Sequence, residues 1–351
     1  MFYRYEIKNN GKEEILYLYL TMNYEFSKEL TSQGDDKDIT RRTKNFIKNN
    51  SIDFKGEKVY LVIDGIVVKT LEIKKEEEIE KLSKNNEVYN NDYLVTIRFD
   101  NDITIEISLK EYLLGALSAN TMDNLELTTL KAICLLYRTY AYKEMKENGC
   151  IKANNGYISY KPISYYKLFW VNNYQNNYNK LKKAISDTEC EFVTYKNDYI
   201  LPFIHITSNG QTENNKLYPY LENRNSIWDY ASPYYLEIKD YDYKYIGKVF
   251  NLKEDEVKDI EILKLNENNH IEKIRIGKRN ISGNTFRDLL SLKSTDINII
   301  VNPTYIRFIT KGWGNNLGLS QFGANEIAKV GCSYIDIIKY YFPKCSIKKY
   351  I

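Results

Sequence analysis

The stretch that decides the fold reads SLKEYLLGALSANTMDNLELTTLKAICLLYRTYAYKEMK and runs from Ser108 to Lys146. It predicts two helices that are separated by a short polar break at residues 120–124. In the second helix, apolar side chains recur at helical spacing from Leu127 to Ala141 and form one stripe that can be buried. Short polar residues favour a helix start, so Asp123 or Asn124 is expected to cap the second helix.

Charged side chains flank this break and allow two interpretations. Asp123 and Glu126 could act as paired carboxylates in glycoside cleavage. Their simpler role is to interact favourably with the N-terminus of the second helix. Lys131 and Arg138 lie seven residues apart and therefore share one helical face.

The composition of the chain limits the classes of function. A net charge of +3 over 351 residues is too small to indicate a nucleic-acid partner. Five cysteines without a C-x-x-C pair and two histidines predict no metal site, and no motif predicts a cofactor. No apolar run near the N-terminus is long enough for a signal peptide or membrane anchor. The compartment is therefore left open by the sequence.

Strand and helix patterns along the chain predict an α+β fold. Hairpins are expected at residues 2–22, 59–73 and 93–107, each around a turn of Asn, Asp or Gly. A short basic helix is expected at 38–49 and a charged helix at 74–84. We predict a small α+β module at residues 1–90 and a larger domain at 91–351.

Two polar loops in the larger domain are candidates for ligand binding. His205, Thr207 and Ser208 belong to the segment HITSNGQT at residues 205–212, where hydroxyl groups suit a polar ligand. A histidine-assisted nucleophile is a weaker interpretation of this segment, because neighbours on one strand rarely form a triad. The second loop, GWGNNLGLSQ at residues 312–321, has glycines that permit close approach of a ligand.

Five segments in order resemble the stage II sporulation protein D family, the SpoIID/LytB domain family. These are EYLLGAL with TLKA and YRTYA, HITSNGQT, PYLENRNSIWD, SGNTFRDLLSLKSTD and GWGNNLGLSQFGANEIAK, and they spread over about residues 93–343. The resemblance implies a mixed sheet with a helical face that forms a glycan cleft. It does not cover the first 90 residues.

The best-known members of that family are bacterial lytic transglycosylases, which cleave peptidoglycan glycan strands and act with a partner amidase during spore formation. Others modify the activity of wall amidases. In the mechanism that the resemblance implies, a glutamic acid protonates the glycosidic oxygen. The family also implies a cell-envelope or extracellular location.

Carried over onto this chain, the position of the family's catalytic glutamate is Asn120, and an amide cannot donate a proton as a general acid. Asn315 stands where the family's glycine-rich loop usually has histidine, while Ser320 and Gln321 are retained. No histidine stands at residues 148–180, where the family has a Cys/His pattern associated with zinc. Asp123 or Glu126 could replace the acid only if the active site tolerates a displaced carboxyl group.

The leading hypothesis is therefore a catalytically impaired protein that binds glycan strands or regulates a wall hydrolase, with a cell-wall amidase as its candidate protein partner. The predicted substrate-binding residues are Asn120, Lys131, Arg138, His205, Thr207, Ser208, Asn315, Ser320 and Gln321. One alternative is an active lytic transglycosylase with a relocated carboxylate. Another is a cytoplasmic interaction protein that no longer contacts the wall.

Overall fold

The computed structural model describes residues 2–9, 14–20, 43–44, 47, 52–53, 58–63, 66–72, 80–82, 90–154, 156–170 and 173–350. The chain divides into two compact units. One comprises Met1–Ile79 with Val330–Cys332, and the other comprises Glu80–Lys329 with Ser333–Ile351. Each unit is described by itself below.

The first unit is built on one four-stranded sheet in the order β1-β2-β3-β4. Both expected hairpins are confirmed, because β1 pairs antiparallel with β2 and β3 pairs antiparallel with β4. The strands are β1 (Phe2–Asn9), β2 (Glu14–Leu20), β3 (Lys58–Ile63) and β4 (Ile66–Glu72). Of the basic helix expected at 38–49, only residues 43, 44 and 47 are described, and all three are helical.

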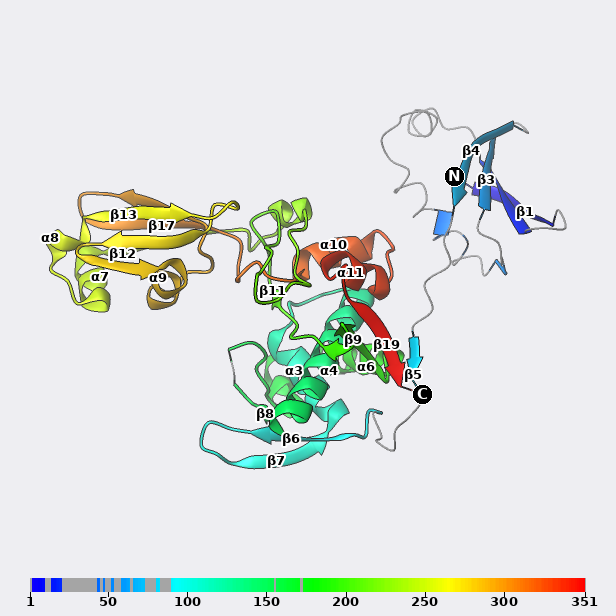
Figure 1. Ribbon diagram of the computed structural model, residues 1–351, viewed down its shortest axis with the longest axis horizontal. Coiled ribbons are helices and arrows are strands. Elements are labelled where there is room, and N and C mark those ends of the chain that lie inside the picture. Colours follow the sequence, from blue (N-terminus) through cyan, green and yellow to red (C-terminus); the bar gives the residue numbers. More distant parts are fainter. Residues whose placement is uncertain are drawn as a thin grey trace. The chain divides into compact units, whose positions relative to one another are not determined.

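In the second unit, the helix pair predicted from the sequence is confirmed as α3 (Leu109–Asn120) and α4 (Leu127–Asn148). The third expected hairpin, β6 (Leu94–Arg98) with β7 (Thr104–Ser108), leads directly into α3. Thirteen of the fourteen positions of α4 from Thr129 to Tyr142 are buried, and the exception is the half-buried Lys131. Helix α4 is therefore the centre of the unit, and α3 and α6 pack against it (Figure 1).

Helix α3 begins with a capping box that its sequence encodes. The Ser108 hydroxyl accepts a hydrogen bond from the Glu111 backbone N–H, while the Glu111 carboxylate accepts one from the Ser108 N–H. One turn further on, Gly115 allows another segment to approach the helix closely. A Cβ at this position would lie 2.4 Å from the Lys161 carbonyl oxygen, so any other residue would force these segments apart.

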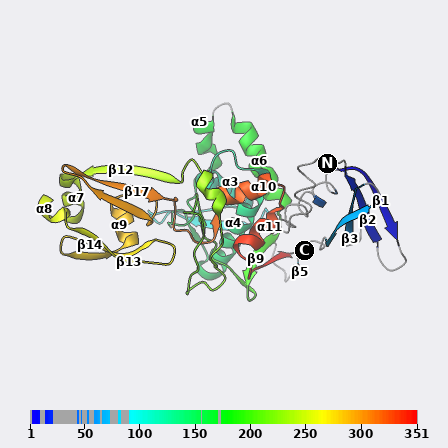
Figure 2. The same cartoon turned by 90° about the horizontal axis from the view of Figure 1, so that it is seen from above.

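The Tyr- and Asn-rich sequence of residues 148–179 has little clear period and predicts a surface excursion, but the structure of this region is more regular than that. It contains β8 (Ile151–Lys152), the 3-10 helix η1 (Ile163–Tyr166), α5 (Lys167–Trp170) and α6 (Tyr174–Asp187). Figure 2 shows α5 and the start of α6 projecting together beyond α3 and α4. Helix α6 has only three buried residues, Leu181, Ala184 and Ile185, so its apolar pattern is too short to stand out in the sequence.

A second sheet has the order β10-β9-β19-β5 and includes the last strand of the chain. Its strands are β5 (Glu80–Leu82), β9 (Glu191–Tyr195), β10 (Asp198–Tyr199) and β19 (Ser346–Tyr350). The charged helix expected at 74–84 is wrong for residues 80–82, which pair in parallel with β19. The rest of that segment lies outside the described residues.

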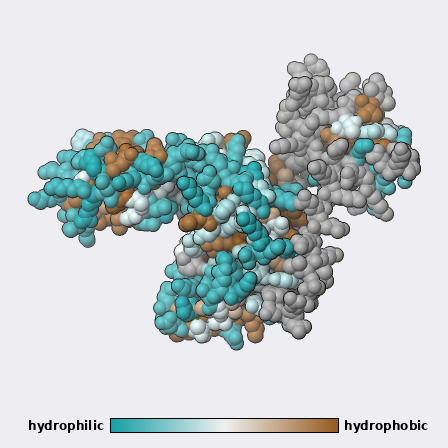
Figure 3. Space-filling view, viewed as in Figure 1, coloured by the Kyte–Doolittle hydropathy of each residue, from teal (hydrophilic) through white to brown (hydrophobic). Residues whose placement is uncertain are grey.

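Residues 236–311 form a β-rich lobe with its own hydrophobic core. Two three-stranded sheets, β12-β17-β16 and β13-β14-β15, and the helices α7 and α9 contribute to this core. Some side chains of the strands stay outside it, and Leu236 and Ile238 on β12 are more than half exposed. Hydrophobic colours therefore appear over this lobe in Figure 3. The elements are β12 (Leu236–Asp242), α7 (Tyr243–Phe250), α8 (Glu254–Val257), β13 (Ile260–Leu265), β14 (Ile271–Ile276), β15 (Arg279–Ser282), α9 (Gly283–Leu289), β16 (Ile297–Val301) and β17 (Tyr305–Lys311).

The two polar loops predicted from the sequence lie next to each other. Strand β11 (Ile204–His205) pairs in parallel with β18 (Leu319–Ser320), and Thr207 forms an isolated bridge with Trp313. The 3-10 helix η3 (Ile227–Ala231) and the helices α10 (Gln321–Lys329) and α11 (Tyr334–Tyr341) complete the unit. The fold is α+β as predicted. Among the residues described here, no helix is long and apolar enough to span a bilayer.

Candidate functional site

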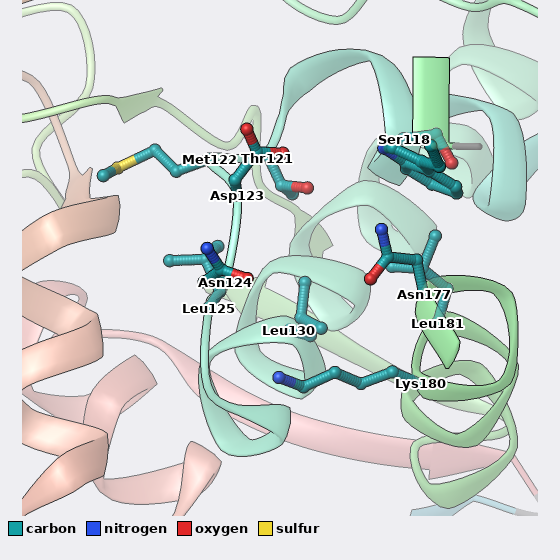
Figure 4. A pocket seen from close by; sticks show the side chains of 11 residues that line it. Ser118, Thr121, Met122, Asp123, Asn124, Leu125, Leu130, Asn177, Lys180 and Leu181 are labelled. Atoms are coloured by element: carbon teal, nitrogen blue, oxygen red, sulfur yellow. The ribbon is translucent and has the colours of Figure 1, made fainter. Parts of the chain in front are cut away.

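A pocket opens at the break between α3 and α4, against the side of α6. It is a small open pocket of about 70 Å³, and its lining is mainly polar (Figure 4). The lining residues are Ser118, Thr121, Met122, Asp123, Asn124, Leu125, Leu130, Trp170, Asn177, Lys180 and Leu181. Amides, hydroxyls and one indole ring in a shallow pocket suit a hydroxyl-rich ligand better than an apolar one.

The break that forms this pocket is held in place by two amide side chains of α10. The Gln321 amide donates to the Asn120 carbonyl at 2.7 Å and accepts from the Met122 N–H at 2.8 Å. One turn later, the Asn325 side chain accepts from the Glu126 N–H at 2.7 Å. Asn325 therefore caps α4 from another helix, and the expectation that Asp123 or Asn124 caps it is wrong. Glu126, the residue before α4, makes no side-chain cap bond.

Asn120 uses its side chain to bind the backbone. Its amide nitrogen donates to the Ala116 carbonyl at 2.6 Å and the Ser159 carbonyl at 2.7 Å, and its oxygen accepts from the Ser159 N–H at 3.0 Å. These bonds fasten residue 159 to the end of α3. The Asn120 amide is thus occupied by protein groups and is not among the residues that line the pocket.

Arg138 is fully buried, contrary to its predicted role in ligand binding. Its guanidinium donates to the Thr188 carbonyl, to the Thr188 hydroxyl at 3.0 Å and to the Ile185 carbonyl at 2.9 Å. These groups belong to the last turn of α6 and the residue after it, where carbonyls lack helical partners. Arg138 therefore fixes α6 to α4 and has no surface on which to receive a ligand.

The side chain of Lys131 is half-buried, with about one-fifth of its surface exposed to solvent. Its ammonium group lies 2.7 Å from the Asp187 carboxylate at the end of α6. Asp187 also lies near Lys183, and these hydrogen bonds lower the pKa of Asp187. Lys131 thus has a protein partner in place of the acidic sugar substituent that we predicted.

Comparison with known proteins supports the family resemblance found in the sequence. A family model described as Stage II sporulation protein matches residues 100–195, which span α3 to α6. Stage II sporulation protein D of Bacillus amyloliquefaciens is 29% identical over 268 residues, covering 72% of this chain and 77% of that protein. The Bacillus subtilis protein of the same name is also 29% identical, over 72% of this chain and 78% of its own length.

The chain is therefore similar to stage II sporulation protein D, and residues 100–195 match that family's model.

A shorter similarity involves another protein of Bacillus subtilis, the amidase enhancer. It is 34% identical over 58 residues, which cover 16% of this chain and 8% of that protein. Because the family model ends at residue 195, its match contains the pocket between α3, α4 and α6 but neither polar loop.

The 205–212 and 312–321 loops meet around a buried carboxylate that the sequence analysis did not single out. Asp229 is fully buried and accepts hydrogen bonds from Ser208 Oγ at 2.5 Å and Ser320 Oγ at 2.8 Å. It also accepts the Ser208 backbone N–H at 2.8 Å. Thr207 is fully buried as well. These buried hydrogen bonds therefore connect the two loops with η3.

His205 is buried beside this cluster. Its Nδ1 donates to the Leu317 carbonyl at 3.0 Å, because a carbonyl oxygen can only accept, and this leaves Nε2 as the acceptor nitrogen. Burial lowers the pKa of His205, so the neutral ring is favoured. Within the part of the chain that the structure describes, no group bonds to the buried Nε2.

Asn315 lies elsewhere, in a polar pocket beside the β-rich lobe. This second pocket shares no lining residue with the first. Its lining includes Glu213, Asn266, His270, Asn284 and Asn315. The structure thus connects Asn120 with Gln321 but does not bring Asn120, Arg138 and Asn315 to one cavity.

The cysteines offer no evident metal site. Cys134 and Cys345 are buried, and burial raises the pKa of the Cys345 thiol to about 12. Over the described ranges, no group of three or more His, Cys, Asp or Glu side chains is arranged to hold a metal ion.

The sequence analysis missed most of the residues that form the first pocket. Of the predicted residues, only Asp123 lines it. Trp170 and Asn177 come from residues 148–179, for which we predicted little regular structure, and Lys180 follows directly. A signal was present, because Tyr174, Tyr178 and Leu181 recur at helical spacing and place Asn177 and Lys180 on neighbouring faces.

Proposed function

We propose that this protein binds peptidoglycan glycan strands during sporulation, or regulates a wall hydrolase that acts on them. The observation that carries the proposal is the polar pocket at the α3–α4 break, within the segment that the family model matches. Its amides and hydroxyls can both donate and accept hydrogen bonds, as sugar hydroxyls do. The similarity to the amidase enhancer makes a cell-wall amidase the first protein partner to test.

Asn120 supports a binding role over a catalytic one. It stands at the position where the family resemblance places the acid, and its amide holds Ser159 and Ala116. General acid catalysis requires a group that can release a proton at the scissile bond. A protein without that group can still hold the strand for a partner enzyme.

The test is binding of purified denuded glycan strands to the full chain and to two matched variants. Lys180 lines the pocket, whereas Lys182 lies on the same helix but is exposed and does not line it. We expect Lys180→Ala with Asn177→Ala to weaken binding about 10-fold or more, since two hydrogen bonds contribute roughly 1 kcal/mol each. Lys182→Ala, which removes the same charge, should leave binding unchanged. Equal affinity of all three proteins would reject this pocket as the binding site.

A second candidate function is strand cleavage by a relocated carboxylate. It is favoured by one observation, that Asp123 lines the pocket while Glu126 does not. Mass spectrometry of denuded glycan after incubation with the protein would detect anhydro-sugar products. Product that is lost in Asp123→Asn but kept in Glu126→Gln would establish this activity, and its absence from the wild-type digest would exclude it.

A further inference from the structure

Six aromatic rings form a continuous series along η1, α5 and the start of α6. We call this series the aromatic ladder, and it consists of Tyr165, Tyr166, Phe169, Trp170, Tyr174 and Tyr178. Neighbouring ring centres lie between 5.0 and 6.3 Å apart along the whole series. These distances are those of rings in direct contact. The ladder is therefore one surface and not a set of scattered residues.

Much of this surface faces solvent. Phe169 is 63% exposed and Tyr165 is 42% exposed. Their neighbour Leu168 is 80% exposed, and α5 has no buried residue. Large apolar side chains that are exposed together on one element are typical of a binding surface. In Figure 2 this element lies at an edge of the helical part, where a long ligand could pass.

The ladder continues into the proposed glycan pocket. Trp170 lines that pocket and is also a member of the ladder, with its ring centre 5.2 Å from Tyr166 and 6.1 Å from Tyr174. Asn177, which also lines the pocket, lies between two ladder residues of α6. A ligand that leaves the pocket on this side would pass directly onto the rings.

The polar groups beside the rings favour a saccharide over a lipid. The α6 segment that carries Tyr174 and Tyr178 also carries amide side chains at four positions, namely Gln175, Asn176, Asn177 and Asn179. Aromatic faces pack on the C–H faces of sugar rings, while amides exchange hydrogen bonds with hydroxyls. Lys161 lies 4.5 Å from the ring centre of Tyr165, so the end of the ladder is also positively charged.

We infer that the aromatic ladder is an extended subsite for a polysaccharide, on which successive sugar rings of a strand stack after leaving the pocket. This inference rests on the proposed function and adds a preference for long strands. A short oligosaccharide fills the pocket alone, whereas a longer strand also reaches Tyr165 and Phe169.

The test compares denuded glycan tetrasaccharides with strands of eight or more sugars by calorimetry on the full chain. We expect the long strands to bind about 10-fold more tightly than the tetrasaccharide. The double variant Tyr165→Ala and Phe169→Ala should lose that gain and keep the tetrasaccharide affinity, since each ring contact accounts for roughly 3- to 10-fold. Leu168→Ala is the matched control, because it removes an exposed apolar side chain that has no ring to stack.

Each outcome decides the inference. If the wild type binds both lengths equally, or the double variant keeps the gain, the ladder is not a glycan subsite although the pocket proposal stands. If Leu168→Ala loses as much of the affinity gain for long strands as the double variant does, and the protein binds anionic lipid vesicles, the surface binds membranes. The inference is then wrong. If the wild type binds neither length, the proposed function fails and the inference fails with it.

Discussion

Around Asp229 the polar side chains of two loops bond to one another, whereas along α5 and α6 the rings and amides face solvent. Both regions contain residue types that suit sugar recognition. In the first region, the hydroxyls of Ser208 and Ser320 donate hydrogen bonds to a buried carboxylate. In the second, Phe169 is more than half exposed. The difference shows that polar residues of a motif can stabilise the fold. A segment without a motif can supply the solvent-accessible surface for a ligand.

The largest expected effect tests the buried side of this comparison at Arg138. Replacing it with alanine removes a buried guanidinium that donates to the carbonyls of Thr188 and Ile185, and the Thr188 carbonyl keeps only the Glu191 N–H. We expect Arg138→Ala to lower the free energy of unfolding by about 3–5 kcal/mol. Urea denaturation followed by circular dichroism measures this change. Lys131→Ala on the same helical face should cost at most about 1 kcal/mol, and equal losses would contradict the assignment.

Asp229→Asn should have the next largest effect. An amide nitrogen cannot accept from a serine hydroxyl, so one of the hydroxyls of Ser208 and Ser320 loses its acceptor in a buried place. A loss of about 1–3 kcal/mol in unfolding free energy is expected. Glycan binding per molecule of folded protein should stay unchanged. A variant as stable as the wild type that no longer binds glycan would place Asp229 in the site.

The buried histidines predict a pH dependence of smaller size. Burial lowers the pKa of both His205 and His270, so both bind protons more readily in the unfolded chain. Their contribution to stability is therefore complete above the unfolded pKa of about 6.5 and is lost as the pH falls below it. Each histidine changes the free energy of unfolding by at most about 1.4 kcal/mol per pH unit in this range. Denaturation midpoints at pH 7 and pH 5.5 should differ less in His270→Asn than in the wild type.

The smallest expected effect on stability is at the exposed side of the comparison. Phe169→Ala removes a ring that is largely in solvent, so the free energy of unfolding should change by no more than about 0.5 kcal/mol. Thermal unfolding of the variant and the wild type at matched concentration checks this. A loss above 2 kcal/mol would show that the ladder belongs to the core.

The sequence predicted the helix pair, the hairpins and the class of fold because those features follow local rules. Leu127 to Ala141 shows one apolar period, and Asn9 to Gly11 is a typical turn. It could not predict that Asn325 caps α4, because that bond joins residues 199 positions apart. It also could not show whether Arg138 faces solvent or carbonyls, since both faces of a central helix are covered by segments distant in sequence.

For the candidate site, the sequence located the break at residues 120–124. Two of the residues that it proposed for ligand binding bond to the protein itself. Lys131 and Arg138 share a face, as their spacing predicted, yet that face meets the end of α6. Trp170 and Lys180 were missed because their helix has few buried residues and therefore a weak apolar period.

The place of β19 in its sheet has a consequence for biosynthesis. This strand, residues 346–350, lies between β9 and β5 and pairs with both of them. The ribosome adds it after every other element of the sheet, so β9 waits unpaired on that edge while some 150 further residues are translated. Closure of the sheet must therefore follow the emergence of β19 from the ribosome, and the edge of β9 stays open during that interval.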